Sequence, residues 1–237
     1  MKILLVAATY GEIAPLLQYL GLAEEPTQGH SQFQYRHFDI EVLITGAGMV
    51  HTTFHLSRVL FQKNYDLAIN VGIAGSFNKK LNIGEIVRVR SQVFGDLGAE
   101  DKDSFIPIAE MVFFDENQFP YQDGKLFSGE EKAIRKSIVL FPILKKMTGV
   151  SSITVNRVLG KKSSIDEAKK IFNPDIESME GGAFFYTCLM SKQDFVELRA
   201  ISNYVEVRNK ANWNIPLAVK NLNQLLIEML ESSENGA

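Results

Sequence analysis

The chain has 237 residues, of which 46% are hydrophobic and 22% charged, and its formal net charge is -3 at pH 7. This length suits one large globular domain, which folds without help from disulfides or a metal ion. The slightly acidic balance provides no basic field for nucleic acid or for an anionic membrane surface. A single cysteine, Cys188, excludes a disulfide within the chain, and its apolar surroundings predict a buried thiol.

Membrane insertion and secretion are not expected. No apolar run reaches the roughly 18 residues that a spanning helix needs. The apolar start at residues 3–8 is short, and Glu12 follows it without a cleavage region. We therefore expect a cytoplasmic protein with no membrane partner.

Strand-like and helix-like segments alternate along the chain. Continuous apolar or β-branched runs predict strands, and apolar residues spaced three and four apart predict helices. The expected strands are 3–8, 33–38, 40–45, 67–76, 86–94, 150–155 and 195–202; the expected helices are 13–20, 50–61, 130–147, 163–172, 181–190 and 215–230. This alternation predicts one α/β domain over residues 1–237, with a frayed tail after residue 231.

Other segments carry weaker signals. Residues 95–101 show no regular period and are expected to form a loop, and 102–129 are expected to be a long excursion that closes over a ligand or reaches a partner subunit. In the strand before them, Arg88 and Arg90 alternate with valines. This pattern predicts a solvated face or a sheet edge.

Small residues follow two of the predicted strands. Gly46 and Gly48 follow one strand and precede a helix, and Gly72 and Gly75 end the next strand. Such a strand–glycine–helix junction lets a phosphate or a ribose approach the backbone, or it forms only a tight turn. Since both strand ends are expected to lie near each other, they suggest one shared pocket floor.

Residues 175–183 contain three carboxylates and two glycines just before an apolar run, so they are a candidate ligand-binding segment. Glu180 is expected at a helix N-terminus, where free N–H groups and the helix dipole stabilise an anion. It either accepts hydrogen bonds from the paired hydroxyls of a sugar or merely caps the helix. Asp175 and Glu177 either support the site or are solvated.

Five motifs follow one another along the chain: Glu12, Gly46-x-Gly48, Gly72-x-Ala74-Gly75, Ser178-Met179-Glu180-Gly181 and Arg199-Ala200-Ile201-Ser202-Asn203. Together they resemble the nucleoside phosphorylase/nucleosidase superfamily. They are closest to its hydrolase branch, the methylthioadenosine/adenosylhomocysteine nucleosidases and the futalosine hydrolases, and segments 94–101 and 201–204 are more similar to the futalosine hydrolases. The resemblance implies a three-layer fold in which helices flank a twisted mixed sheet.

The resemblance also implies roles around the sugar and the water. Glu12 matches the acid that orients and deprotonates the attacking water, and Thr45 and Arg199 match positions that hold this water. Met179 and Glu180 match the ribose-binding pair. These roles suit the chemistry, because breaking an N-glycosidic bond builds positive charge on the ribose, which an ionised carboxylate stabilises.

At the base, the resemblance places Asn203 where the methylthioadenosine enzymes carry an aspartate that protonates N7 of adenine. Gly46, Gly75 and Ser202 are expected to contact the substrate as well. An amide cannot donate a full proton, but its NH₂ group can donate to N7 or to a 6-oxo group, and a 6-oxopurine presents acceptors at both positions. This favours hypoxanthine as the leaving base without excluding adenine; alternatively, Asn203 is only a turn residue.

The implied function is therefore hydrolysis of futalosine to hypoxanthine and dehypoxanthine futalosine in menaquinone biosynthesis, without metal or cofactor, by a homodimer. Residues 7–12 contain an acid and no arginine, which favours water over phosphate as the nucleophile. The alternatives are a methylthioadenosine/adenosylhomocysteine nucleosidase, a purine nucleoside phosphorylase, and a nucleoside-binding module without catalytic activity.

A few residues have two interpretations. Arg208, Lys210 and Trp213 either meet a carboxylate-bearing aryl tail of the substrate or lie on a solvated turn. His51 and His55 have a spacing that can bind a metal, but no third ligand is evident and we expect ordinary helix residues.

Overall fold

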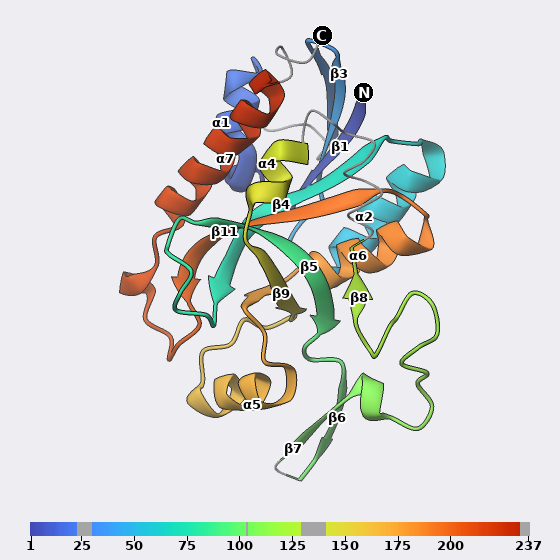
Figure 1. Ribbon diagram of the computed structural model, residues 1–237, viewed down its shortest axis with the longest axis vertical. Coiled ribbons are helices and arrows are strands. Elements are labelled where there is room, and N and C mark those ends of the chain that lie inside the picture. The colour runs from blue at the N-terminus through green and yellow to red at the C-terminus, as the bar shows by residue number, and fades with distance from the viewer. Residues whose placement is uncertain (23–29, 103, 129–140, 233–237) are drawn as a thin grey trace.

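The computed structural model describes residues 1–22, 30–102, 104–128 and 141–232, and Figure 1 shows a large twisted sheet between helices. Nine strands of the described residues form this sheet in the order β10-β9-β5-β11-β4-β1-β3-β2, with β8 paired to β5. The strands are β1 (Lys2–Ala7), β2 (His30–Tyr35), β3 (Phe38–Ile44), β4 (Leu67–Ser76), β5 (Ile86–Phe94), β8 (Leu126–Phe127), β9 (Gly149–Thr154), β10 (Ile176–Ser178) and β11 (Phe195–Tyr204).

The sheet is mixed, and one part of it closes on itself. β1 runs parallel to β3 and β4, and β4 runs parallel to β11. β5 is antiparallel to β11 and parallel to β9. The short strand β10 pairs with β9 on one side and with β4 on the other, so that five strands form a ring. This closure brings the ends of β4, β10 and β11 together.

Helices cover both faces of the sheet and complete three layers. Along β1, Ile3, Leu5 and Ala7 pack against α1 (Tyr10–Tyr19) and α7 (Ile215–Glu231). The intervening Leu4 and Val6 pack with α2 (Met49–Gln62) and α6 (Gly181–Met190). Since side chains alternate across a strand, an unbroken apolar run is what burial on both faces requires. The predicted three-layer α/β fold is confirmed.

Most predicted elements are confirmed. The remaining described helices are α4 (Phe141–Lys146), α5 (Lys162–Phe172) and two 3₁₀ turns, Ile108–Glu110 and Lys210–Asn212. The start of the helix expected at 130–147 and all but residue 232 of the expected frayed tail lie outside the described residues. Cys188 is fully buried on α6, as expected.

One expectation was wrong, and another holds only in part. The segment 95–101 is not only a loop, because β6 (Gly98–Asp101) pairs with β7 (Ser104–Pro107) in a hairpin. Strand β5 is not at an edge, because it lies between β9 and β11, and the face predicted to be solvated is so only in part: Arg90 is exposed, but Arg88 is buried at 6% exposure. Alternation of valine and arginine cannot distinguish a solvated face from an interior face that holds buried charges.

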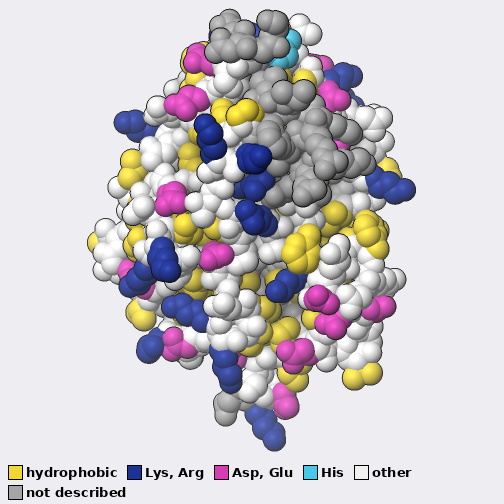
Figure 2. All heavy atoms as spheres, in the orientation of Figure 1, with side chains coloured by type: hydrophobic (Ala, Val, Ile, Leu, Met, Phe, Trp, Pro, Cys, Tyr) yellow, Lys and Arg dark blue, Asp and Glu magenta, His cyan; other side chains and the backbone are white. Residues whose placement is uncertain are grey.

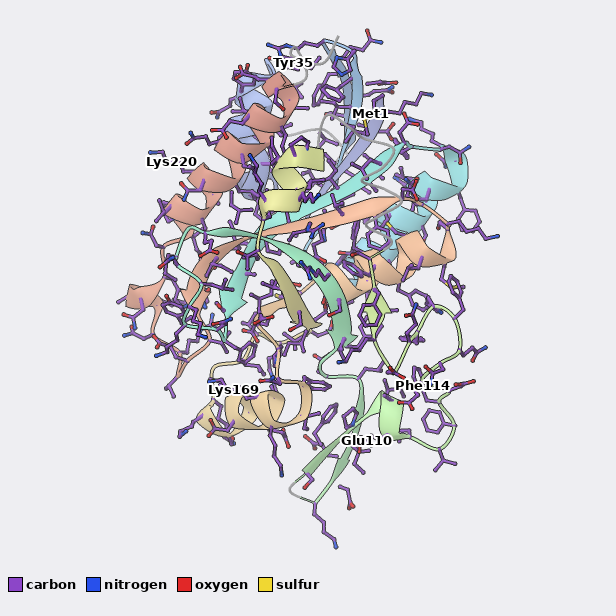
Figure 3. All side chains as sticks on the ribbon, viewed as in Figure 1. Met1, Tyr35, Glu110, Phe114, Lys169 and Lys220 are labelled. Carbon is purple, nitrogen blue, oxygen red and sulfur yellow. The ribbon has the colours of Figure 1, made fainter. Side chains whose placement is uncertain are left out.

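The hairpin and the segment that follows it project from one end of the molecule. In Figure 3, Glu110 and Phe114 of this segment lie at the end opposite Met1 and Tyr35. Val112, Phe113 and Phe119 are strongly exposed for apolar residues. On the face drawn in Figure 2, Lys and Arg side chains are interspersed with Asp and Glu, so no large patch of one charge covers it. None of the helices in the described ranges combines the length and apolarity needed to cross a bilayer.

Helix α6 approaches the sheet closely because it begins with two glycines. A Cβ built on Gly181 would collide with the Gln92 amide and lie 2.6 Å from Glu197 Oε1, and one on Gly182 would lie 2.8 Å from the Phe94 ring. These two glycines therefore make room for side chains of the sheet.

We predict that Gly181→Ala lowers the free energy of unfolding by about 1–3 kcal/mol, because the added methyl must displace buried side chains. Urea denaturation measures the change. The matched control is Gly11→Ala on α1, where a Cβ would meet nothing within 4 Å; it should be neutral or stabilising by up to about 1 kcal/mol. Equal losses in both variants would contradict the packing argument.

Candidate active site

A cavity of about 450 Å³ lies where the carboxyl ends of β4, β10 and β11 meet the N-terminus of α1. Six of the predicted site residues line it together, although they are separated by up to 191 positions in the chain. They are Glu12, Gly75, Met179, Glu180, Ser202 and Asn203. The closed ring of strands accounts for this convergence, because it brings the loops that follow three strands to one edge.

Glu12 is held by hydrogen bonds to both carboxylate oxygens. Helix α1 begins at Tyr10, earlier than the expected residue 13, so Glu12 lies in its first turn rather than in a loop. Oε2 accepts from the Thr9 N–H at 3.0 Å and from the Thr9 hydroxyl at 3.1 Å, and Oε1 accepts from the Ile73 N–H at 3.1 Å. The carboxylate is thereby fixed between α1 and β4.

Glu180 stands at the N-cap of α6, but its side chain does not cap that helix. Oε1 accepts from the Gly48 N–H at the start of α2, at 3.0 Å, and Oε2 lies 3.8 Å from Arg199 Nη1. The interpretation of Glu180 as a simple capping residue is therefore wrong. Its carboxylate is oriented by two other elements and faces the cavity.

Arg199 links the acids from beneath the cavity. It is fully buried, and its Nε donates to Glu197 Oε1 at 2.6 Å. Gly72, opposite Arg199 on the neighbouring strand, leaves the room that the guanidinium needs, since a Cβ there would touch Nη1 and lie 2.7 Å from Glu12 Oε1. One cation is thus attracted to the three carboxylates of Glu12, Glu180 and Glu197.

Burial and neighbouring charges shift the pKa values of Arg199 and Glu12. Burial alone lowers the pKa of Arg199, but the carboxylates of Glu197, Glu180 and Glu12 together raise that pKa above its usual value. Burial raises the pKa of Glu12 above 4.5, and this effect exceeds the opposing effects of Arg199 and the Ile73 N–H. A carboxyl with a raised pKa is a stronger base, as proton abstraction requires.

At the other end of the cavity, Asn203 follows an irregularity in β11. The pairing with β4 shifts between Ile201 and Asn203, so Ser202 is an extra residue, and such bulges re-aim side chains. The Ser202 hydroxyl donates to Asn203 Oδ1 at 2.8 Å, and Nδ2 donates to the Tyr204 carbonyl at 3.1 Å. The amide is thereby oriented, and its NH₂ has a second hydrogen to offer.

Three predicted residues do not line the cavity. Thr45 is buried, and its hydroxyl lies 2.9 Å from the Gly46 carbonyl, which it can donate to. Gly46 has a φ of 83°, a left-handed conformation that favours glycine, and the next residue, Ala47, reaches the cavity instead. Arg199 lies beneath the cavity wall, against the acids it contacts. The roles of Thr45 and Arg199 in holding the water, and of Gly46 in contacting the substrate, stay predictions.

Sequence reasoning missed Asn223 of α7, which is 1% exposed. Pro15 interrupts α1 because it lacks an N–H. Asn223 Nδ2 donates to the Glu12 carbonyl at 2.8 Å, and its Oδ1 accepts from the Leu16 N–H at 2.9 Å. These two backbone groups bond to each other in an unbroken helix, so the side chain bridges them and fixes the turn that carries Glu12. The signal available in the sequence was an asparagine on the apolar face of a predicted helix, where a polar side chain needs a buried partner.

Glu197 was missed as well, although Glu197 and Arg199 share one face of a predicted core strand. Glu197 is fully buried and also accepts from Gln92 Nε2 at 2.9 Å. Of the residues left open, Trp213 lines the cavity, and the Arg208 guanidinium lies 5.1 Å from its ring centre. Within the described ranges, no cluster of His, Cys, Asp and Glu suited to a metal ion is found.

The sequence profile of the Phosphorylase superfamily matches residues 2–231. The chain belongs to this superfamily, which confirms the resemblance stated above. Its structural neighbours include the native futalosine hydrolase of Helicobacter pylori, with a TM-score of 0.77 and 19% identity, covering 98% of this chain and 97% of the other. A nucleosidase mutant of the same organism with 5'-methylthioadenosine in its active site has a TM-score of 0.76 and 20% identity, covering 97% and 98%. These two likenesses show a shared fold.

Curated relatives fall into the same two groups. A futalosine hydrolase of Thermus thermophilus is 29% identical over 202 residues, covering 82% of each chain. One of Acidothermus cellulolyticus is 24% identical over 234 residues, covering 94% of this chain and 87% of the relative. A 5'-methylthioadenosine/S-adenosylhomocysteine nucleosidase of Maridesulfovibrio salexigens is 28% identical over 219 residues, covering 86% and 87%.

We predict that Asn223→Ala lowers the free energy of unfolding by about 1–3 kcal/mol, because it leaves buried backbone groups of α1 unpaired. Urea denaturation measures this loss. Gln224→Ala is the control, since that side chain is exposed on the same helix and bonds only Glu228; its effect should stay within about 0.5 kcal/mol. If Asn223→Ala leaves the free energy of unfolding unchanged, α1 does not depend on the bridge.

Proposed function

We propose that this protein hydrolyses the N-glycosidic bond of a purine nucleoside. The observation that carries the proposal is that Glu12, Glu180 and Asn203 share one cavity. They supply a base for water, an acceptor for the sugar and a donor for the leaving base. A nucleoside-binding module would need the acceptor and the donor but not a constrained base with a raised pKa.

Glu180 serves the ribose. Its carboxylate is held by the Gly48 N–H and lies near Arg199, so it can accept from the paired sugar hydroxyls without reorientation. As the bond to the base breaks, the ribosyl group becomes cationic, and a fixed carboxylate stabilises that charge in the transition state more than in the ground state.

Glu12 serves the water. With both oxygens oriented by N–H and O–H donors and with its pKa raised by burial, it is suited to take a proton from a water that attacks the anomeric carbon. Arg199 Nη2 is buried and has no hydrogen-bond partner among the described residues. Because this nitrogen has an N–H to donate, it supports the predicted role of Arg199 in holding the attacking water.

Water is the proposed nucleophile rather than phosphate. In the described part of the chain, the wall of the cavity carries the carboxylates of Glu12 and Glu180, the carboxyl group of Glu177 and no arginine, lysine or histidine. A phosphate dianion placed beside these acids would be repelled, whereas a neutral water would not.

Futalosine is the proposed substrate, with hypoxanthine as the released base and menaquinone biosynthesis as the context. The Asn203 amide suits the two acceptors of a 6-oxopurine edge, and the pair of Trp213 and Arg208 suits a carboxylate-bearing aryl group on the 5' side. Futalosine hydrolases and methylthioadenosine/adenosylhomocysteine nucleosidases are both among the relatives, so a 5'-methylthioadenosine/S-adenosylhomocysteine nucleosidase is the second candidate.

We further propose that the protein acts in the cytoplasm as a homodimer without metal or cofactor. Support for the dimer comes from the exposed apolar side chains Val112, Phe113 and Phe119 and from Phe54 and Phe61 on α2. Apolar patches of this kind mark protein–protein contacts when they are contiguous.

The purified protein should release hypoxanthine from futalosine faster than it releases bases from inosine or methylthioadenosine, with a rate that does not depend on phosphate. Chromatography of the free base measures this. A phosphate requirement would replace hydrolysis by phosphorolysis, and preferential release of adenine would favour the nucleosidase alternative.

Glu12→Gln should lower kcat by about 10²–10⁴-fold, the usual contribution of a general base, while KM changes little. Wild-type kcat should fall as the pH drops through the pKa of Glu12, at a pH above 4.5, because only the carboxylate can accept a proton. Steady-state kinetics over pH 4–9 measure both effects. A variant with wild-type kcat would exclude Glu12 as the base.

A further inference from the structure

A second acid lies at the base end of the cavity. Glu177 of β10 lines the cavity and is 4% exposed. Gly75 pairs with Glu177 on one side and with Asn203 on the other. A Cβ on Gly75 would lie 3.4 Å from Glu177 Cγ and 3.2 Å from Asn203 Nδ2. The side chains of Glu177 and Asn203 therefore lie on the same side of the sheet, on either side of Gly75.

Within the described residues, no cationic side chain pairs with Glu177. The two strands that pair with β10, β4 and β9, contain no ionisable side chain. Among the described residues, the only hydrogen bond to the carboxyl comes from the Leu159 N–H, at 3.3 Å and 3.4 Å from its two oxygens.

The other charged groups on the elements around Glu177 bond to other residues, are exposed or, like Arg208, stack on Trp213. Asp175, two residues earlier, accepts from the Ser151 N–H at 2.9 Å. Beyond β11, Glu206 accepts from the Asn212 amide, and in the loop after β9 Arg157 is exposed. Glu12 and Glu180 share the cavity wall, and both are acids.

An acid in this setting keeps its proton. Burial raises the pKa of Glu177 to about 7, and the Leu159 N–H lowers it only in part. Near neutral pH a substantial fraction of the side chain is therefore a carboxylic acid with an O–H to donate. The Asn203 amide beside it cannot give up a proton.

We infer that Glu177 is the acid that protonates the departing purine, with Asn203 holding the edge of the base beside it. The inference rests on the proposed function and names the source of the proton for that same reaction. It accounts for how a chain with an amide at position 203 can activate a purine leaving group.

The protons balance in this step. The electron pair of the bond between the anomeric carbon and N9 passes to the base, and the O–H of Glu177 transfers its proton to N7, so the purine leaves neutral. Water bonds to the anomeric carbon and gives one proton to the carboxylate of Glu12. After product release, Glu12 returns that proton to solvent and Glu177 takes one up.

The test compares wild type with Glu177→Gln on two substrates. For the purine nucleoside, kcat should fall by about 10²–10⁴-fold, the usual contribution of a general acid, while KM changes little. For p-nitrophenyl β-D-ribofuranoside, whose phenolate leaves without a proton, kcat should be unchanged. Glu206→Gln, outside the cavity wall, is the matched control and should keep wild-type rates on both.

The pH profile provides a second readout that needs only the purine nucleoside. Because the acid must be protonated, wild-type kcat should decline as the pH rises through about 7, the pKa of Glu177, and Glu177→Gln should lack this decline. If Glu177 had a purely structural role, Glu177→Gln would lower kcat equally on both substrates and leave the pH profile of kcat unchanged. That result would overturn the inference. Wild-type kcat in Glu177→Gln would overturn it as well.

Stability gives a check on folding. The native state holds the Glu177 proton more tightly than the unfolded state, so wild-type stability due to this group is lost as the pH rises from 4.5 to about 7. Glu177→Gln should therefore have a higher Tm than wild type at pH 8 and not at pH 4.5. If wild type releases no base from any purine nucleoside, the proposed function fails; if wild type is active and Glu177→Gln behaves like it, only the present inference fails.

Discussion

The contact on which the site depends is the buried guanidinium of Arg199 among the carboxylates of Glu197, Glu180 and Glu12. A buried charge is costly unless it is paired and hydrogen-bonded. Arg199 is paired with Glu197 at 2.6 Å, and its remaining charge stabilises the two acids above it. Three carboxylates around one cation leave the group negative when all are ionised. This is the potential that a developing ribosyl cation requires.

The fold supplies this arrangement through two features of the strands. Gly72 gives Arg199 room to approach Glu12, and Gly75 lets Glu177 and Asn203 approach each other. The closure of the sheet through β10, which pairs with both β9 and β4, sets these positions side by side. The glycine-tipped strand β4 thus forms the floor between a sugar end, with Glu12 and Glu180, and a base end, with Glu177 and Asn203.

Much of this was predictable from the sequence, for identifiable reasons. The unbroken apolar runs predicted the buried strands, the small residues at two strand ends predicted one shared pocket floor, and the family resemblance implied that Glu12, Glu180 and Asn203 act on one substrate. The buried partners were not predictable in the same way. Arg88 and Glu197 alternate with apolar residues along their strands, as the residues of a solvated face do, and only three-dimensional packing shows that they are interior. Asn223 lies on an apolar helix face, which indicates burial but not the contacts it makes with α1. The hairpin of β6 and β7 was missed because each strand has only four residues and β6 contains a glycine and two acids.

The central claim is that Glu12 directs a water to the anomeric carbon of a nucleoside held by Glu180. Turnover in ¹⁸O-labelled water followed by mass spectrometry of the sugar product tests this most directly. The account predicts one ¹⁸O atom at the anomeric position of every sugar released, in phosphate-free buffer. Sugar product without the label, or product formed only as a phosphate ester, would contradict it.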